Sequence, residues 1–306
     1  MKKKLSVFMV LTLLACGLLA GCGTTKRSNV TVGTSCVSLG ADLTEGERAS
    51  VLAMLNLTEE SLAASKLITV TNAREHEVLD SVFGPEVSGT KAQSCCRVIA
   101  REDGHGITVS TQNVNFVTNA MYENALATAG MRDAELLVAA PFPMPGTAAL
   151  IGAMEAYSAL YGTKVDNNRI SGAAEEMSVT EQIAETLNDP QKAAAYIAAV
   201  KAEAAAEKNA SDDKLDEMID SVAAQLGFTL SEEEHNMVRV LLRKLEKLHI
   251  SSEELVGQAR GIYDYLKSQG LDMSRYGASE EDVEGFFGVI GKMWDDFMNW
   301  LGSLFH

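Results

Sequence analysis

The chain has 306 residues, of which 46% are hydrophobic and 22% are charged, a composition that excludes general disorder and fits a folded globular protein. Its length allows one large domain or two domains of ordinary size. Aromatic residues make up only 6% of the chain, so the core must be mostly aliphatic. The formal net charge of −16 repels a phosphate backbone, which argues against nucleic acid as a partner.

The first 21 residues have the pattern of a secretory signal peptide. Three lysines at positions 2–4 precede an uncharged apolar stretch, which ends in "LAGC" at 19–22. This ending matches the bacterial lipobox, in which the cysteine is acylated and the chain is cut just before it. We therefore expect 1–21 to be a lipoprotein signal peptide, Cys22 to carry the lipid and 22–30 to form a short polar tether.

Two other interpretations of the leader stay open. The signal peptide could be cleaved without lipidation, or the eighteen uncharged residues from Leu5 to Cys22 could span a bilayer at the lower limit of length. Lipidation predicts an extracytoplasmic protein on the outer face of the cytoplasmic membrane, with the bilayer as its partner through acylated Cys22. A tether of about eight residues would span roughly 15 Å, which keeps the folded part close to the bilayer.

Residues 31–162 alternate strand-like and helix-like segments. Apolar and β-branched runs predict strands at 34–40 and 66–71, a hairpin around the turn "REDGHG" at 101–106, and a central strand at 134–140. Helices are predicted between these strands, and they start at Thr44 in a capping box with Glu47, at Asn72, at Thr118 or Asn119, and at Thr147. The order βαβαββαβα predicts an α+β or α/β fold with a mixed, largely parallel sheet.

The rest of the chain is predicted to be helical. Residues 163–176 lose their periodicity and are expected to be a linker, followed by an all-helical domain over 177–281. Within it, Ser231 and Glu234 form a second capping box. The alanine-rich stretch at 193–208 is helix-prone but weakly amphipathic, which predicts an exposed or mobile arm.

Several stretches together carry a family resemblance. They are "SLGADLTEGERASVL" at 38–52, "TVTNAREHEVL" at 69–79, "MYENALATAGMRDAELLVAAPF" at 121–142 and "GTAALIGAMEAY" at 146–157. With these motifs the chain resembles the YpuA-like family, a group of exported proteins of unknown function found mainly in Gram-positive-type bacteria. The resemblance implies a location in the cell envelope and no particular activity.

Four strand-to-helix loops, at 40–42, 71–72, 113–119 and 141–147, offer a candidate ligand-binding edge. If their strands are parallel, the loops gather at one edge of the sheet, where open α/β sheets usually bind ligands. The polar groups expected there are Asp42, Asn72, His76 and Thr147, with helix N-termini that favour anions. The alternative is that these residues only cap helices and shape turns.

Other residues give little sign of chemistry. Glu75, His76 and Glu77 are consecutive on a helix and cannot chelate one ion, so no metal site is expected. No hydrolase, phosphate-loop or zinc motif occurs, no cofactor is expected, and an enzyme is the less favoured interpretation. Cys36, Cys95 and Cys96 leave at least one unpaired thiol beside a lipidated Cys22, and all three could equally be small apolar core residues.

The C-terminal stretch at 282–306 is predicted to be an aromatic amphipathic helix. Its polar stripe lacks the lysines and arginines typical of helices that lie in a membrane surface, so both membrane contact and docking on protein remain open. The side chains expected to contact a membrane or a partner are Phe286, Phe287, Trp294, Phe297, Trp300 and Leu301.

The leading functional hypothesis is a membrane-anchored extracytoplasmic lipoprotein that works as a non-catalytic binding or interaction module of the cell envelope. Its partner would be an envelope protein or a cell-wall component. The alternative is an envelope enzyme that acts on a cell-wall or lipid substrate through the strand-to-helix loops.

Overall fold

The computed structural model describes residues 30–115, 117–164, 166–207, 209–250 and 255. Cys22 and the aromatic residues of 282–306 therefore lie outside the described residues, as do the signal peptide and most of the tether. None of the helices in the described ranges combines the length and the apolarity needed to cross a bilayer. The strands are β1 (Ser35–Gly40), β2 (Lys66–Val70), β3 (Cys95–Ala100), β4 (Ile107–Val114) and β5 (Ala134–Met144).

Helices follow the strands in the predicted order, with two short extra helices, α3 and α5. The first seven described helices are α2 (Glu45–Met54), α3 (Glu59–Ala63), α4 (Asn72–Phe83), α5 (Pro85–Ser88), α6 (Asn119–Thr128), α7 (Thr147–Tyr161) and α8 (Asn167–Leu187). The remaining ones are α9 (Pro190–Ala206), α10 (Asp212–Gln225) and α11 (Glu232–Glu246). An N-terminal sheet region followed by a helical region confirms the predicted fold class.

The five strands form one mixed sheet in the order β2-β1-β3-β5-β4. β1 is parallel to β2 and β4 is parallel to β5, whereas β3 is antiparallel to both of its neighbours, β1 and β5. Four strands therefore run in one direction and β3 runs against them. The predicted hairpin is wrong, because β5 inserts between β3 and β4 and takes the backbone hydrogen bonds that a hairpin would have used.

Local signals set the helix starts. The capping boxes of Thr44 with Glu47 and of Ser231 with Glu234 both form as predicted. Helix α4 differs, because Thr71 is its N-cap and accepts a hydrogen bond from the Arg74 amide. Asn72 is the first helical residue, which leaves its side chain free for another contact.

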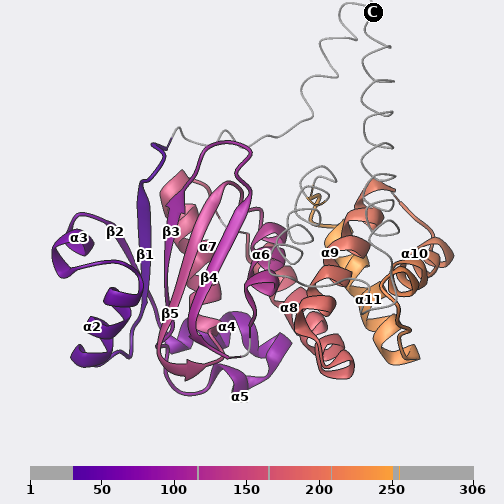
Figure 1. The fold of residues 1–306 in the computed structure, drawn as a ribbon, viewed down its shortest axis with the longest axis horizontal. Coiled ribbons are helices and arrows are strands. Elements are labelled where there is room, and N and C mark those ends of the chain that lie inside the picture. The colour runs from indigo at the N-terminus through magenta and orange to yellow at the C-terminus, as the bar shows by residue number, and fades with distance from the viewer. Residues whose placement is uncertain (1–29, 116, 165, 208, 251–254, 256–306) are drawn as a thin grey trace, which may run out of the picture.

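Helices cover both faces of the sheet (Figure 1). On one face, Val51 and Leu52 of α2 and Leu62 of α3 pack on Val37 and Cys95 of the strands. On the other face, α7 and α6 begin an apolar core that continues without a break into α8–α11. β1 and β3 are therefore buried on both sides, as expected of strands enclosed between helical layers, whereas the edge strands β2 and β4 are partly exposed.

Two predictions about the helical part are wrong. Residues 167–176, expected to belong to a linker, form the first half of α8, and Gly172 lets α8 pack closely because a Cβ there would lie 2.7 Å from Leu248. The alanine-rich stretch is not an exposed arm but the buried helix α9, in which Tyr196 and Ile197 are fully enclosed. Its weak amphipathicity reflects burial around most of its circumference.

Candidate functional site

The strand-to-helix loops do gather at one edge of the sheet. β1, β2, β4 and β5 run in the same direction, so their carboxyl ends and the loops that follow them share that edge. Because β3 runs in the opposite direction, its amino end lies there too, and residues 84–94, which lead into β3, cross the same edge. We call residues 84–94 the edge segment.

Asp42 and Asn72 hold the edge segment in place. Asp42 Oδ2 accepts a hydrogen bond from the Ala92 amide at 2.8 Å, and the Asp42 amide donates to Ala92 O at 3.0 Å. The Asn72 side chain donates to Ser88 O at 3.1 Å. A Cβ on Gly40 would lie 2.3 Å from Ala92 O, so the lack of a side chain there lets the segment approach β1.

His76 is a third anchor for the edge segment. Its Nδ1 lies 2.8 Å from Asp80 Oδ1, and its Nε2 lies 2.9 Å from Gly89 O. Both ring nitrogens face acceptors, and only a protonated imidazole donates from both. The hydrogen bond with Asp80 raises the pKa of His76, in agreement with a positively charged ring. With Nε2 bound to a carbonyl oxygen, the ring has no nitrogen free to act as a general base in this state.

Thr147 reaches a buried acid at the same edge. Its Oγ1 donates to Glu75 Oε1 at 2.8 Å, and Glu75 is only 1% exposed. The second oxygen, Glu75 Oε2, is buried without a hydrogen-bond partner among the described residues. Burial raises the pKa of Glu75 to about 7, although the hydrogen bond from Thr147, the nearby Asn72 amide and the charge of His76 all lower it.

Glu75 was not among the predicted site residues, because a charged side chain at a helix start usually faces water. The useful signal was its spacing: Glu75 lies three and four residues before Val78 and Leu79, the buried residues of α4, and so shares their face. The four predicted residues thus converge as expected, but the hydrogen bonds described above go to the chain itself.

A second buried polar cluster lies among the helices and has no counterpart in the sequence prediction. Lys201 of α9 lies 2.6 Å from Glu176 Oε1 of α8, and both side chains are at most 2% exposed. Lys201 also donates to Asn124 O at 3.2 Å and to Thr128 Oγ1 at 3.1 Å, which ties α6 into the pair. Burial lowers the pKa of Lys201 and raises that of Glu176.

Neither cluster has the make-up of a metal centre. Among the residues that the structure describes, no three His, Cys, Asp or Glu side chains lie close enough together to hold an ion. The groups that act on the buried acid Glu75 are the hydroxyl of Thr147, the amide of Asn72, the imidazole of His76 and one carboxylate, Asp42.

The sequence of the chain matches a protein family over most of its length. The family described as "Protein of unknown function (DUF1002)" matches residues 39–262, and the chain belongs to it. A relative is the "Uncharacterized protein YpuA" of Bacillus subtilis (strain 168), which is 33% identical over 225 residues, 73% of this chain and 76% of the relative. No solved structure matches the chain. The family match includes the whole strand-end edge and stops short of Cys22 and of the aromatic stretch at 282–306.

Proposed function

We propose that this protein is a lipid-anchored extracytoplasmic lipoprotein on the outer face of the cytoplasmic membrane, and that it works as a non-catalytic binding or interaction module of the cell envelope. The observation that carries the proposal is the leader, in which a basic start and an apolar stretch end in "LAGC" with Cys22 at the attachment position. The anchor would hold an acidic body beside a membrane whose anionic headgroups repel most of its surface.

The non-catalytic part of the proposal is supported by the state of the polar groups at the strand ends. Asp42, Asn72 and His76 bind the edge segment, and Thr147 binds Glu75. These contacts give the polar groups a role in holding the chain's own segments together, and both ring nitrogens of His76 are engaged in them. Proximity labelling from the anchored protein in its own cells would identify the envelope protein or cell-wall component that it contacts.

Lipidation is tested by metabolic labelling with palmitate. We expect the full chain to incorporate label and the Cys22→Ala variant to incorporate none. The Cys16→Ala variant is the matched control, because Cys16 lies inside the predicted leader and its loss should leave labelling unchanged. Equal labelling of the wild type and the Cys22→Ala variant would contradict the proposal.

A further inference from the structure

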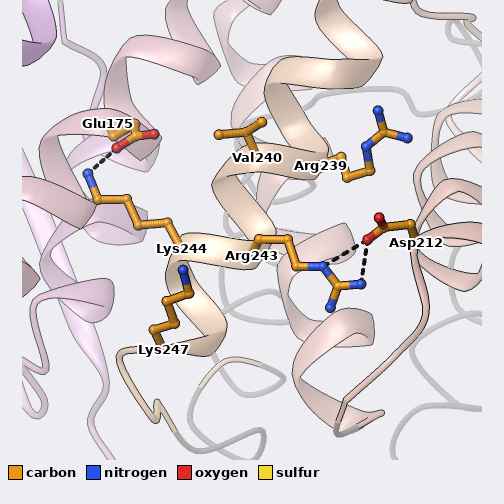
Figure 2. A pocket seen from close by; sticks show the side chains of 7 residues that line it. All are labelled: Glu175, Asp212, Arg239, Val240, Arg243, Lys244 and Lys247. Atoms are coloured by element: carbon orange, nitrogen blue, oxygen red, sulfur yellow. Dashed lines mark hydrogen bonds and ion pairs between the residues drawn. The ribbon is translucent and has the colours of Figure 1, made fainter.

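A shallow hollow lies over the outward face of α11, between α8 and α10, with a volume of about 450 Å³ (Figure 2). Four cationic side chains line it, Arg239, Arg243, Lys244 and Lys247, and two carboxylates, Glu175 and Asp212, complete the charged lining. The lining thus has a net of two positive charges on a chain whose net charge is −16. We call it the cationic hollow.

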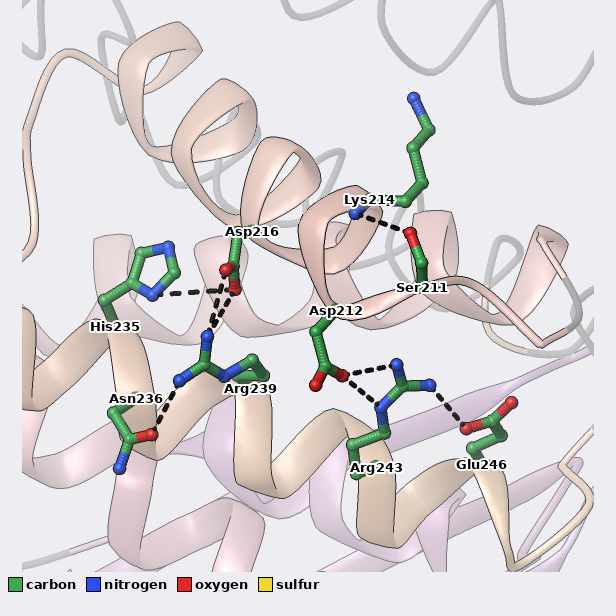
Figure 3. A network of polar contacts seen from close by, with 9 residues as sticks. All are labelled: Ser211, Asp212, Lys214, Asp216, His235, Asn236, Arg239, Arg243 and Glu246. Carbon is green, nitrogen blue, oxygen red and sulfur yellow. Dashed lines mark hydrogen bonds and ion pairs between the residues drawn. The ribbon is translucent and has the colours of Figure 1, made fainter.

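The two arginines are held in fixed orientations by Asp212, which lines the hollow, and by Asp216 and Glu246, which do not (Figure 3). Arg239 contacts Asp216 at 2.9 and 3.1 Å, and Arg243 contacts Asp212 at 2.6 and 3.0 Å and Glu246 at 3.1 Å. These contacts use only part of the five N–H groups of each guanidinium. A pre-oriented guanidinium loses less side-chain entropy when it binds an anion.

The lysines differ from each other in a way that is useful for testing. Lys244 is paired with Glu175 and donates to Ser171 at 3.1 Å. Lys247 is exposed, and its backbone amide donates to Lys244 O at 3.2 Å, but its side chain makes no hydrogen bond or ion pair with any residue in the described ranges. Its charge is therefore available to a ligand and contributes little to holding the helices together.

Helix-end electrostatics explain only part of this arrangement. Cations in the last turn of a helix are stabilised by the partial negative charge there, which accounts for Arg243 and Lys244. Arg239 lies a full turn earlier. Val240, 52% exposed, also lines the hollow, with Lys244 on one side of it and Arg239 on the other in Figure 2. An apolar side chain flanked by fixed cations is the kind of lining that ligand sites for organic anions have.

We propose that the cationic hollow binds a phosphate-bearing anion. A phosphate monoester has a charge of about −1.5 to −2 at neutral pH, and its oxygens accept from both guanidinium and ammonium groups. The Arg239, Arg243 and Lys244 side chains are already paired with acids, so the ammonium of Lys247 supplies the uncompensated positive charge. Val240 would contact the organic part of the ligand. The phosphate could come from a soluble compound or from a lipid headgroup, and the proposal does not depend on lipidation of Cys22.

The test is isothermal titration of the full chain in micelles of a neutral detergent at low salt. One arm adds inorganic phosphate or glycerol phosphate, and the other adds a short-chain anionic phospholipid to the micelles. Lys247→Glu is the test variant, and Lys164→Glu is the matched control, with the same change of charge at an exposed lysine that lines neither the hollow nor the strand-end edge. Thermal unfolding of both variants checks that the fold is kept.

We expect saturable binding in at least one arm and a loss of affinity of about tenfold or more in Lys247→Glu, with Lys164→Glu unchanged. Binding of soluble phosphate identifies a soluble source, and binding only to anionic micelles identifies a headgroup. Saturable binding in neither arm would overturn the proposal. An equal loss in the two variants would do so as well, because it would mean that net charge alone governs binding.

Discussion

At the scale of single residues, the buried charges of Glu176 and Lys201 depend most strongly on their partners for stability. Each side chain is almost fully enclosed, so each charge depends on the other and on Thr128 for the interactions that water would otherwise supply. Removing one partner of such a pair leaves an uncompensated buried charge, whereas replacing both with apolar groups of similar size is far less harmful.

We therefore predict that Lys201→Met lowers the free energy of unfolding by about 3–5 kcal/mol. The double variant Glu176→Leu/Lys201→Met should recover a large part of that loss. The exposed pair of Lys214 and Glu217 serves as the control, since solvent screens this pair and Lys214→Met should leave the free energy of unfolding almost unchanged. Denaturant unfolding measures all three, and a double variant as unstable as Lys201→Met would refute the account.

The second residue-scale prediction concerns Glu75. Its pKa of about 7 in the folded protein lies above the ordinary value of 4.5. Between these values the folded state holds more protons than the unfolded state, so the free energy of unfolding falls as pH rises through this window. Glu75→Gln should remove roughly 3 kcal/mol of that fall at most.

The measurement is denaturant unfolding of Glu75→Gln at pH 5 and at pH 8, next to the wild type. Glu123 and Glu181, whose pKa values are also raised to about 7, titrate in the same window and are unchanged in the variant. Glu60→Gln, at an exposed position, is the control and should leave the pH dependence as it is. An unaltered pH dependence in Glu75→Gln would contradict a raised pKa at Glu75.

At the scale of elements, the edge segment is held to α4 by a histidine whose charge depends on pH. The hydrogen bond with Asp80 raises the pKa of His76 above its ordinary value of 6.5. The stability that this contact contributes is fully present below the unfolded pKa and is lost as pH rises through the folded pKa. We therefore expect the edge segment to open more often at high pH.

Hydrogen exchange followed by mass spectrometry tests this. His76→Ala should speed exchange of amides in residues 84–94 at pH 6, because Gly89 O loses its imidazole donor. The effect of the substitution should shrink above the folded pKa of His76. His105→Ala, in the turn between β3 and β4, is the control and should leave the edge segment unchanged. Equal exchange in wild type and His76→Ala at pH 6 would rule out the anchor.

The helix starts could be predicted where the sequence signal lies within a few residues. Capping boxes at Thr44 and Ser231 fix helix starts through side-chain contacts three residues apart, which any chain of this sequence can make. The errors came where the signal is not local. The β3–β4 turn looks like a hairpin, but a later strand, β5, competes for the same hydrogen bonds, and no short window of sequence contains both.

The candidate ligand-binding edge was predicted only in part, because some of its contacts join segments that are distant in the sequence. Asp42, Asn72, His76 and Thr147 could be placed together because parallel strands bring their carboxyl ends to one edge. Their actual partners could not be predicted, because Ala92, the partner of Asp42, lies 50 residues away in the sequence. No sequence pattern in residues 84–94 indicates that this segment lies over the strand ends. The four cations of the hollow lie within residues 239–247, but only the tertiary structure places Glu175 of α8 and Asp212 of α10 beside them, so the hollow itself could not be predicted.

At the scale of the whole molecule, the covering of both sheet faces determines the state of the thiols. Cys95 faces the core shared with α2 and α3, whereas Cys36 and Cys96 face the opposite core. All three are free and fully buried, and burial raises the pKa of Cys36 to about 11 and that of Cys95 to about 12. A thiol that is both enclosed and protonated reacts slowly.

We predict that Cys36, Cys95 and Cys96 do not react with a thiol reagent in the native protein purified from its own cells. In denaturant, that protein should titrate three thiols if Cys22 is acylated and four if the leader is removed without lipidation. Fast reaction of any of the three before unfolding would contradict the two-sided cover of the sheet.

The sequence by itself determined the order of strands and helices, the capped helix starts, the family and the candidate lipid attachment at Cys22, because each depends on neighbours within a few residues or on a contiguous motif. Only the tertiary structure decided the insertion of β5 beside β3, the burial of α9, the enclosure of Glu75 and the covering of the strand ends by residues 84–94. Those features depend on contacts between segments distant in the sequence, and such contacts stabilise the fold only after folding has brought the segments together.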